Sequence, residues 1–326
     1  MTLEELGWGP DLAAAFTPYG ERGLVPARVA SQHRGSFDLL SEAGEPTGMP
    51  GGTLRGLPAV GDWVAAAPVA EEAKAVIEAV LPRRSAFTRS NPWTGKEEVV
   101  AANVDTALVV TALGRDFSPR RLERYLAAAH ESGAEPVVVV NKTDLDPDAL
   151  AETLEQARAI APGVAVHALS AKTGAGLEQL AGYLAVGRTV ALLGSSGVGK
   201  STLANRLAGA ELLSTGAVRA DEQGRHTTSR RQLVPLPAGG LLLDTPGLRE
   251  LQLSGADLEE TFPEIAALAG GCRFRDCTHD HEPGCAVIAA VEAGELPRDR
   301  YESYLKLTGE LRELAERRRR AAQARR

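Results

Sequence analysis

The chain has 326 residues, of which 44% are hydrophobic and 24% charged, a balance typical of globular proteins with room for two or three cores. A net charge of −7 excludes binding to nucleic acid by overall charge alone, so any such contact needs local basic patches. The sequence has no apolar stretch long enough to span a bilayer and no signal-peptide pattern at its start, so we expect a cytoplasmic protein with no membrane partner.

The segment from about Leu24 to Pro82 consists of short extended runs broken by glycine and proline. Several short strands at close spacing indicate a small antiparallel barrel, and the length suits the five-stranded oligonucleotide-binding (OB) type. We predict an N-terminal segment over 1–23 and an OB-fold RNA-binding domain over 24–98. Phe37 and Trp63 are its candidates for stacking on bases, although a core position suits Trp63 better.

Two basic clusters are candidates for contacts with RNA phosphates. One is PRRSAFTR near residue 85, and the other is ERRRRAAQARR at the end of the chain. Local clusters of this kind can bind RNA on an acidic protein. For the terminal cluster, the alternative is the solvated end of an amphipathic helix.

From about Val104 the pattern changes to apolar strand-like runs that alternate with helical patterns. The runs VVVV and LLL fit strands buried on both faces, and their alternation with helices predicts a parallel, doubly wound α/β sheet. We assign residues 99–252 to this domain. Beyond Leu253 the pattern is helical around a Cys- and His-rich segment, which predicts a C-terminal helical domain over 253–326.

A phosphate-binding loop (P-loop) follows the strand-like run TVALL. Its residues match G-x-x-x-x-G-K-S and open a helical pattern: Gly194, Ser195, Ser196, Gly197, Val198, Gly199, Lys200, Ser201 and Thr202. In such loops, backbone N–H groups at a helix N-terminus cradle phosphate, the lysine reaches the β- and γ-phosphates, and the hydroxyl binds Mg²⁺. We therefore expect Lys200 on the phosphates and Ser201 on Mg²⁺.

The sequence DTPG, Asp244 to Gly247, follows the strand-like run LLL. By itself DTPG is an ordinary turn, but downstream of a phosphate loop it is typical of the second carboxylate site of a nucleotide hydrolase. We expect Asp244 to hold Mg²⁺ through water and the Gly247 N–H to contact the γ-phosphate.

Two further loops predict recognition of guanine. The first follows VVVV and comprises Asn141, Lys142, Thr143 and Asp144; the second comprises Ser170, Ala171 and Lys172. The Asp144 carboxylate suits the N1–H and N2–H donors of guanine and discriminates against adenine. We expect Asn141 to bridge toward N7, the Lys142 stem to lie over the ring, and the second loop to donate a backbone N–H to O6.

The order of these motifs is unusual because the base loops precede the phosphate loop. Opening a conventional GTPase between its DTPG half and its NKTD half, and joining the old ends, produces the order G4-G5-G1-G2-G3. Both halves keep their strands, and the nucleotide still binds at the carboxyl ends of the sheet. The sequence therefore predicts a circularly permuted P-loop GTPase domain that binds GTP and GDP.

All three cysteines lie in GCRFRDCTHDHEPGC, as Cys272, Cys277 and Cys285, with His279 and His281 between them. Three thiolates and one imidazole complete a closed tetrahedral site, so we predict one structural Zn²⁺ per chain. Free buried cysteines are the alternative, and a redox function is disfavoured because no C-x-x-C pair is present.

With these motifs together, the chain resembles the RsgA (YjeQ) family of circularly permuted, ribosome-associated GTPases. The resemblance covers nearly the whole chain and includes AVGDWV, LPRRSAFTR, AANVDTALVV, GRHTTSR, DTPGLRE and CRFRDCTHDHEPGCAV. It implies the OB barrel, the central GTPase and a zinc domain whose ligands are Cys272, Cys277, His279 and Cys285. It also implies late maturation of the small (30S) ribosomal subunit, with rRNA binding and subunit-stimulated hydrolysis of GTP.

The region around DTPG refines the expected mechanism. Leu248 stands where Ras-like enzymes place a water-positioning glutamine, so intrinsic hydrolysis should be slow. His226 is the candidate replacement, also by resemblance; a surface histidine is the alternative. Thr227 or Thr228 is expected to supply a hydroxyl to Mg²⁺, and the sequence leaves that choice open. Gly197 occupies the position where many potassium-dependent GTPases have asparagine, which predicts no potassium dependence.

The favoured function is a monomeric GTPase enzyme of small-subunit maturation, with Mg²⁺ accompanying GTP. A second is a GTP-gated RNA-binding placement factor whose hydrolysis serves only release. A third is an ATP-using phosphotransferase, against which Asp144 argues. Action on the large subunit is disfavoured by the barrel and the cysteine cluster.

Overall fold

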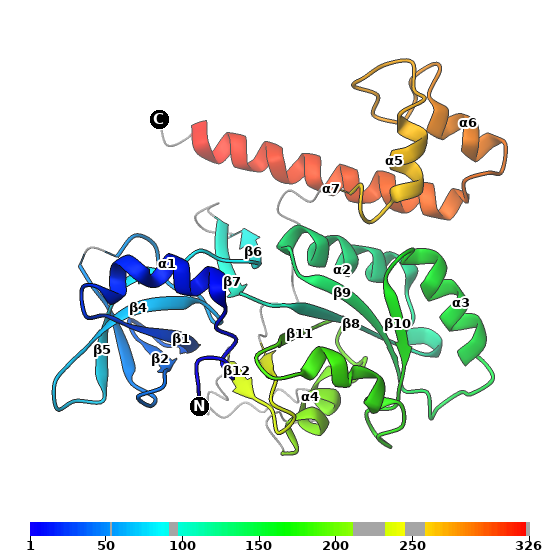
Figure 1. Ribbon diagram of the computed structural model, residues 1–326. Coiled ribbons are helices and arrows are strands. Elements are labelled where there is room, and N and C mark those ends of the chain that lie inside the picture. Colours follow the sequence, from blue (N-terminus) through cyan, green and yellow to red (C-terminus); the bar gives the residue numbers. More distant parts are fainter. Residues whose placement is uncertain (53, 91–96, 211–231, 245–257, 324–326) are drawn as a thin grey trace, which may run out of the picture.

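The computed structural model describes the chain except residues 53, 91–96, 211–231, 245–257 and 324–326 (Figure 1). A barrel, an α/β sheet and a set of helices follow one another along the chain, as predicted (Figure 1). No helix among the described residues combines the length and the hydrophobicity that a membrane span requires.

Helix α1 (Pro10–Gly20) precedes a five-stranded barrel. Its strands are β1 (Val25–Gln32), β2 (Phe37–Leu40), β3 (Thr47–Pro50), β4 (Trp63–Pro68) and β5 (Lys74–Val80). They pair in the closed order β1-β2-β3-β5-β4-β1, antiparallel except for the β3–β5 pair. The OB-like barrel is therefore confirmed.

The two aromatic candidates for base stacking are core residues. Phe37 and Trp63 are 1% and 0% exposed. Phe37 packs inside the barrel, whereas Trp63 meets Trp8 of the N-terminal segment edge to face, with ring centroids 4.7 Å apart. Base stacking is therefore wrong for Phe37, whereas the core position that was favoured for Trp63 is confirmed. The pleat of their strands directs both side chains into the protein.

The first basic cluster lies on and before the hairpin of β6 (Ala86–Ser90) and β7 (Glu97–Ala102). Arg83 donates two hydrogen bonds of 2.7 Å each to the carboxylate of Asp62, a fully buried residue that directly precedes β4 of the barrel. Arg84 lies 3.6 Å from Asp105 at the start of the α/β region. These arginines therefore join the barrel to the sheet. The Arg83 guanidinium is engaged by Asp62 within the protein, which makes it a weaker candidate for contact with RNA phosphates.

The α/β sheet contains five parallel strands: β8 (Thr106–Ala112), β9 (Glu135–Asn141), β10 (Ala165–Ala168), β11 (Thr189–Leu193) and β13 (Leu241–Asp244). Their order is β10-β9-β8-β11-β13, and β12 (Gln232–Pro235) adds to the edge antiparallel to β13. Pairing of Ser31 in β1 with Gln232 merges sheet and barrel into one eleven-stranded sheet. The parallel sheet is confirmed, while the antiparallel edge and the continuity with the barrel were not predicted.

Helices cover both faces of the sheet, as a doubly wound fold requires (Figure 1). Helices α2 (Pro119–Ser132) and α3 (Leu150–Ile160) pack on one face, where Val138 and Val140 meet Leu122 and Leu126. Helix α4 (Lys200–Ala208) and the 3₁₀ segment η2 (Leu177–Leu184) pack on the other. A second 3₁₀ segment, η1 (Gly114–Asp116), links β8 to α2.

The C-terminal region contains α5 (Pro263–Ala269), α6 (Ala286–Glu292) and α7 (Arg298–Gln323), and α7 passes over α2 (Figure 1). Arg300 of α7 is buried and lies 2.8 Å from Glu123 of α2 and 2.5 Å from Glu264 of α5. This pairing satisfies a buried guanidinium and ties three helices together. Toward the chain end, Arg317 and Arg320 are exposed and pair with glutamates one turn back in α7.

Candidate functional site

The predicted nucleotide loops converge on one edge of the parallel sheet. The NKTD loop follows β9, Ser170–Lys172 follows β10, the P-loop follows β11, and Asp244 ends β13. Because these strands are parallel, their carboxyl ends share one edge, which is where open α/β sheets bind ligands. The sheet thus places four distant stretches of sequence around one site.

The P-loop wraps closely against the sheet. Gly194 has a φ of +138°, and a Cβ atom there would lie 2.2 Å from the carbonyl oxygen of Val110. Only glycine can take this path, because any side chain would collide with the backbone of β8. Helix α4 then begins at Lys200, so its first N–H groups point toward the space in front of the loop.

Lys200 lies over this loop with little exposure to solvent. Its ammonium donates to the carbonyl oxygens of Gly194 at 2.7 Å and Ser195 at 2.5 Å. The residue is 8% exposed, so the carbonyl dipoles replace water around the charge. A cation held at this point can contact phosphate groups that are bound by the loop.

Asn141 joins three of the loops, a function that the sequence did not reveal. Its Nδ2 donates to the carbonyl oxygen of Val198 in the P-loop at 2.8 Å, and its Oδ1 accepts from the N–H of Ala171 at 2.9 Å. The side chain is 2% exposed. A buried carboxamide with both ends bonded fixes the spacing between the base loops and the phosphate loop.

Asp144 is exposed and is oriented by the second loop. The Ser170 hydroxyl donates to Asp144 Oδ1 at 2.6 Å and accepts from the N–H of Thr173 at 3.2 Å. The hydroxyl contact holds the pKa of the Asp144 carboxyl below its usual value. The group is therefore ionised at neutral pH and only accepts hydrogen bonds, as recognition of two N–H donors requires.

Arg206 is a supporting residue that sequence reasoning missed. From the last turn of α4, its Nε donates to the carbonyl oxygen of Ala171 at 3.2 Å, and its Nη2 donates to that of Lys172 at 2.5 Å. It therefore holds the second base loop from behind. An arginine near a helix end carries no sequence signal for such a contact, because the loop lies more than thirty residues upstream.

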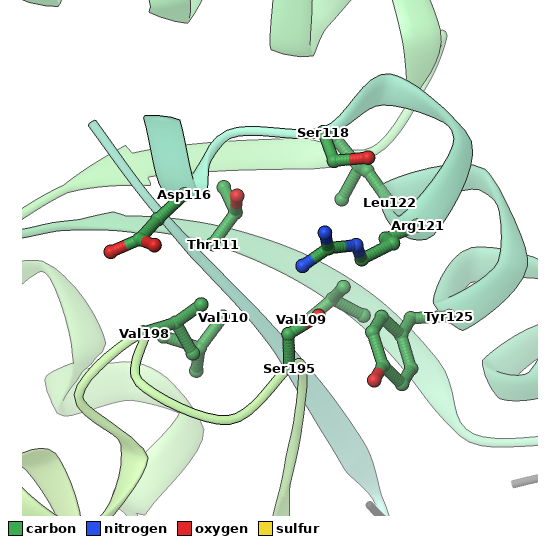
Figure 2. A pocket seen from close by; sticks show the side chains of 10 residues that line it. All are labelled: Val109, Val110, Thr111, Asp116, Ser118, Arg121, Leu122, Tyr125, Ser195 and Val198. Atoms are coloured by element: carbon green, nitrogen blue, oxygen red, sulfur yellow. The ribbon is translucent and has the colours of Figure 1, made fainter. Parts of the chain in front are cut away.

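A hollow opens between the P-loop and the first turns of α2 (Figure 2). Ser195 and Val198 of the P-loop form one wall, and Arg121 and Tyr125 of α2 form the other. Asp116 of η1 lies at its rim, on the side of Val198 (Figure 2). The hollow thus borders the loop on which Lys200 lies.

The cysteine cluster is brought together in the C-terminal region. The ligand atoms of Cys272, Cys277, His279 and Cys285 all lie within 4.8 Å of one another. Cys272 Sγ is 3.9 Å from Cys285 Sγ, and His279 Nδ1 is 3.5 Å and 3.4 Å from these sulfurs. Around a tetrahedral zinc ion the separations would be about 3.8 Å for two sulfurs and about 3.6 Å for sulfur and nitrogen. The four residues can hold such a metal ion, whereas His281 has an 83% exposed side chain.

Comparison with known proteins shows to which family the chain belongs. The profile of the family described as RsgA GTPase matches residues 80–254, more than half of the chain. The chain belongs to the RsgA GTPase family. It is 51% identical over 330 residues to the small ribosomal subunit biogenesis GTPase RsgA of Opitutus terrae, covering 95% of this chain and 90% of that protein. It is 45% identical to RsgA 2 of Lactiplantibacillus plantarum, with the same shares of each chain covered.

Solved structures of similar proteins share the fold of this RsgA GTPase. YjeQ from Thermotoga maritima superposes with a TM-score of 0.66 at 31% identity, covering 88% of this chain and 98% of that one. YloQ, described as a circularly permuted GTPase, superposes with a TM-score of 0.65 at 25% identity, covering 89% and 96%. The predicted circular permutation is confirmed.

In this RsgA GTPase the cysteine cluster is supported by neighbouring groups. The Tyr301 hydroxyl of α7 donates to the His279 carbonyl oxygen at 2.6 Å. Glu282 accepts hydrogen bonds from the N–H groups of Thr278 at 2.9 Å and Asp280 at 3.2 Å. These contacts stabilise the turn between Cys277 and Cys285. Hydrogen bonds from Thr278 also keep the pKa of Glu282 far below its usual value.

The predicted switch residues His226, Thr227, Thr228 and Gly247 lie outside the residues that the structure describes, as does Leu248. Their functions in this RsgA GTPase therefore stay predictions from the sequence.

Proposed function

We propose that this GTPase acts in late maturation of the small (30S) ribosomal subunit in the cytoplasm, as a monomer that contacts rRNA and hydrolyses GTP to GDP and phosphate. The relatives' names, small ribosomal subunit biogenesis GTPase, support the partner. The observation that carries the nucleotide assignment is the Asn141 bridge, which joins both base loops to the P-loop. We propose that the chain divides into an N-terminal segment (1–23), an OB-fold RNA-binding domain (24–98), the circularly permuted GTPase domain (99–252) and a C-terminal helical domain (253–326).

Nucleotide recognition is divided among the loops. We propose that Asp144 accepts from guanine N1–H and N2–H, while Ser170 orients it and Ala171 and Lys172 bring their loop to O6. The Asn141 NH₂ group has a second hydrogen that can reach N7 while the first stays on Val198. The remaining nucleotide contacts would come from Lys142, Thr143, Gly194, Ser195, Ser196, Gly197, Val198, Gly199, Lys200, Ser201 and Thr202.

Hydrolysis would rest on charge stabilisation and on the orientation of water. Lys200 would stabilise charge on the β- and γ-phosphates, and the Gly247 N–H would contact the γ-phosphate. His226 would orient or polarise the attacking water. Ser201, Asp244 and one of Thr227 and Thr228 would hold Mg²⁺, which neutralises phosphate charge.

We propose that the cluster of Cys272, Cys277, His279 and Cys285 holds one structural Zn²⁺. Three thiolates and an imidazole favour zinc over harder cations, which prefer oxygen ligands. Four protein ligands complete a tetrahedron, so no position is left for substrate. The site would therefore stabilise the C-terminal helices and take no part in hydrolysis.

We expect small ribosomal subunits to stimulate GTP turnover strongly, at least about tenfold, and purified large subunits to leave it near the basal rate. His226→Ala should lose the stimulated rate while its affinity for GTP stays intact, because the residue would act on water and not on the base. The measurement is phosphate release with each subunit, beside titration of labelled GTP. Equal rates with both subunits would overturn the assignment of the partner. Completion of one maturation round by GTP-bound His226→Ala protein would show that hydrolysis serves only release.

Replacement of Asp144 by asparagine should reverse the base preference. The amide can donate to the 2-oxo group of xanthine but cannot accept two N–H bonds from guanine, so GDP affinity should fall about 100-fold and XDP affinity should rise. Competition of GDP, XDP and ADP against a fluorescent nucleotide measures this. Asp148→Asn, an exposed change in the same loop, should keep the preference for guanine. A variant that still prefers GDP would contradict the proposed base site.

A further inference from the structure

Lys142, whose stem is expected over the guanine ring, forms an ion pair with Asp116. Its Nζ lies 2.7 Å from Asp116 Oδ2, with side chains 28% and 46% exposed. The two residues come from different strand ends, since Lys142 follows β9 and Asp116 ends η1 after β8. The pair therefore links two adjacent loops at the nucleotide edge of the sheet.

The backbone of Lys142 is left-handed, with a φ of +64°. Residues other than glycine seldom adopt this conformation, and such strain concentrates at ligand-binding positions. The preceding residue, Asn141, is fixed by its hydrogen bonds to Val198 and Ala171, and this restricts the backbone at Lys142. The ion pair with Asp116 restricts the ammonium end of the Lys142 side chain.

We infer that Asp116 is a positioning residue for nucleotide binding: its carboxylate anchors the Lys142 ammonium so that the lysine stem is ordered before the base arrives. This inference rests on the proposed guanine site. Long lysine side chains lose much rotamer freedom when a ligand orders them. An anchor already present without nucleotide removes part of that loss from the binding step.

A purely electrostatic function of Asp116 predicts the opposite change in nucleotide affinity when its carboxylate is removed. If Asp116 acted only as a negative charge near an anionic ligand, its removal would tighten the binding of GDP. If it positions Lys142, its removal weakens the binding of GDP and GTP alike. Figure 2 shows Asp116 at the rim of the hollow on the side of Val198 in the P-loop. At this position the carboxylate could either repel an anionic nucleotide or position Lys142, so the experiment must distinguish the two.

The test is a double-mutant cycle on GDP affinity with Asp116→Asn, Lys142→Met and the double variant. Methionine keeps an unbranched apolar stem for the ring and lacks the ammonium. We expect Asp116→Asn to weaken GDP binding about threefold, the size of a partly exposed ion pair, and to have no further effect beside Lys142→Met. Asp148→Asn is the matched control, because it removes an exposed carboxylate from the NKTD loop and should not weaken binding.

Tighter or unchanged binding by Asp116→Asn would overturn the inference. So would a loss that is equal with and without the Lys142 ammonium, or one that Asp148→Asn reproduces. Titration of the wild-type protein with GDP, XDP and ADP separates the two proposals. If guanine is preferred but the cycle shows no coupling, only the inference fails; if no base is preferred, the guanine site itself fails. Thermal melting of each variant excludes loss of the fold as the cause.

Discussion

Replacement of Gly199 by alanine is expected to weaken the binding of GDP and GTP by at least about 100-fold. Gly199 precedes α4 with a φ of +98°, and a Cβ atom there would lie 2.3 Å from Asn141 Nδ2. The added methyl group must displace the Asn141 side chain, which breaks its bonds to Val198 and Ala171. One substitution thus strains the P-loop and separates it from both base loops.

Gly209 offers a matched control because it caps the other end of the same helix. Its φ is +66°, but the nearest atom to an added Cβ is the Pro237 ring carbon at 3.7 Å. Gly209→Ala should lower the free energy of unfolding by about 1 kcal/mol and leave nucleotide affinity unchanged. Nucleotide titration and thermal melting of both variants measure this. Equal affinities for Gly199→Ala and the wild type would contradict the proposed linkage of the three loops.

Loss of the metal site is expected to unfold the region from Leu258 to Leu296. Helices α5 and α6 have only seven residues each and would not persist alone. Cys285 directly precedes α6 and is 5% exposed among the other candidate ligands. Structural zinc sites supply an apparent binding free energy of about 10–16 kcal/mol at neutral pH, far more than these short helices could replace.

Cys285→Ser should therefore lose its bound metal and become sensitive to proteases between residues 258 and 296, and a strong chelator should do the same to the wild type. Metal analysis and limited proteolysis measure the two effects. GDP binding should persist, because the base loops and the P-loop lie on the parallel sheet. His281→Ala is the matched control, since its exposed side chain lies outside the cluster. Retention of metal by Cys285→Ser, or its loss from His281→Ala, would contradict the assignment of ligands.

Short-range patterns in the sequence were sufficient to predict which loops would form the candidate nucleotide site. The P-loop, NKTD and DTPG are runs of four to eight residues whose function depends on local backbone conformation. Their order along the chain was sufficient to predict the circular permutation. Alternating strand and helix patterns were sufficient to predict the parallel sheet, because strands buried on both faces require continuous apolar runs such as VVVV.

Contacts between distant segments were decided by the tertiary structure alone. Residue spacing alone did not choose between His279 and His281, and the prediction of His279 rested on the family resemblance. The folded loop buries His279 and leaves the His281 side chain exposed. The bridge made by Asn141 spans 57 residues to Val198, and the support from Arg206 spans 35 to Ala171. Neither has a local signal, because a side chain's partner depends on which strands become neighbours.

The same reason explains the errors in the barrel and at its junction with the sheet. Phe37 was a possible base-stacking residue until strand pairing fixed which side of the pleat faces the core. Arg83 belongs to a basic cluster in the sequence, but the fold places the Asp62 carboxylate against it. The sequence by itself determined which chemical groups are present and their local geometry. Strand register and the packing of distant segments decided which of these groups are buried, paired or left open to a ligand.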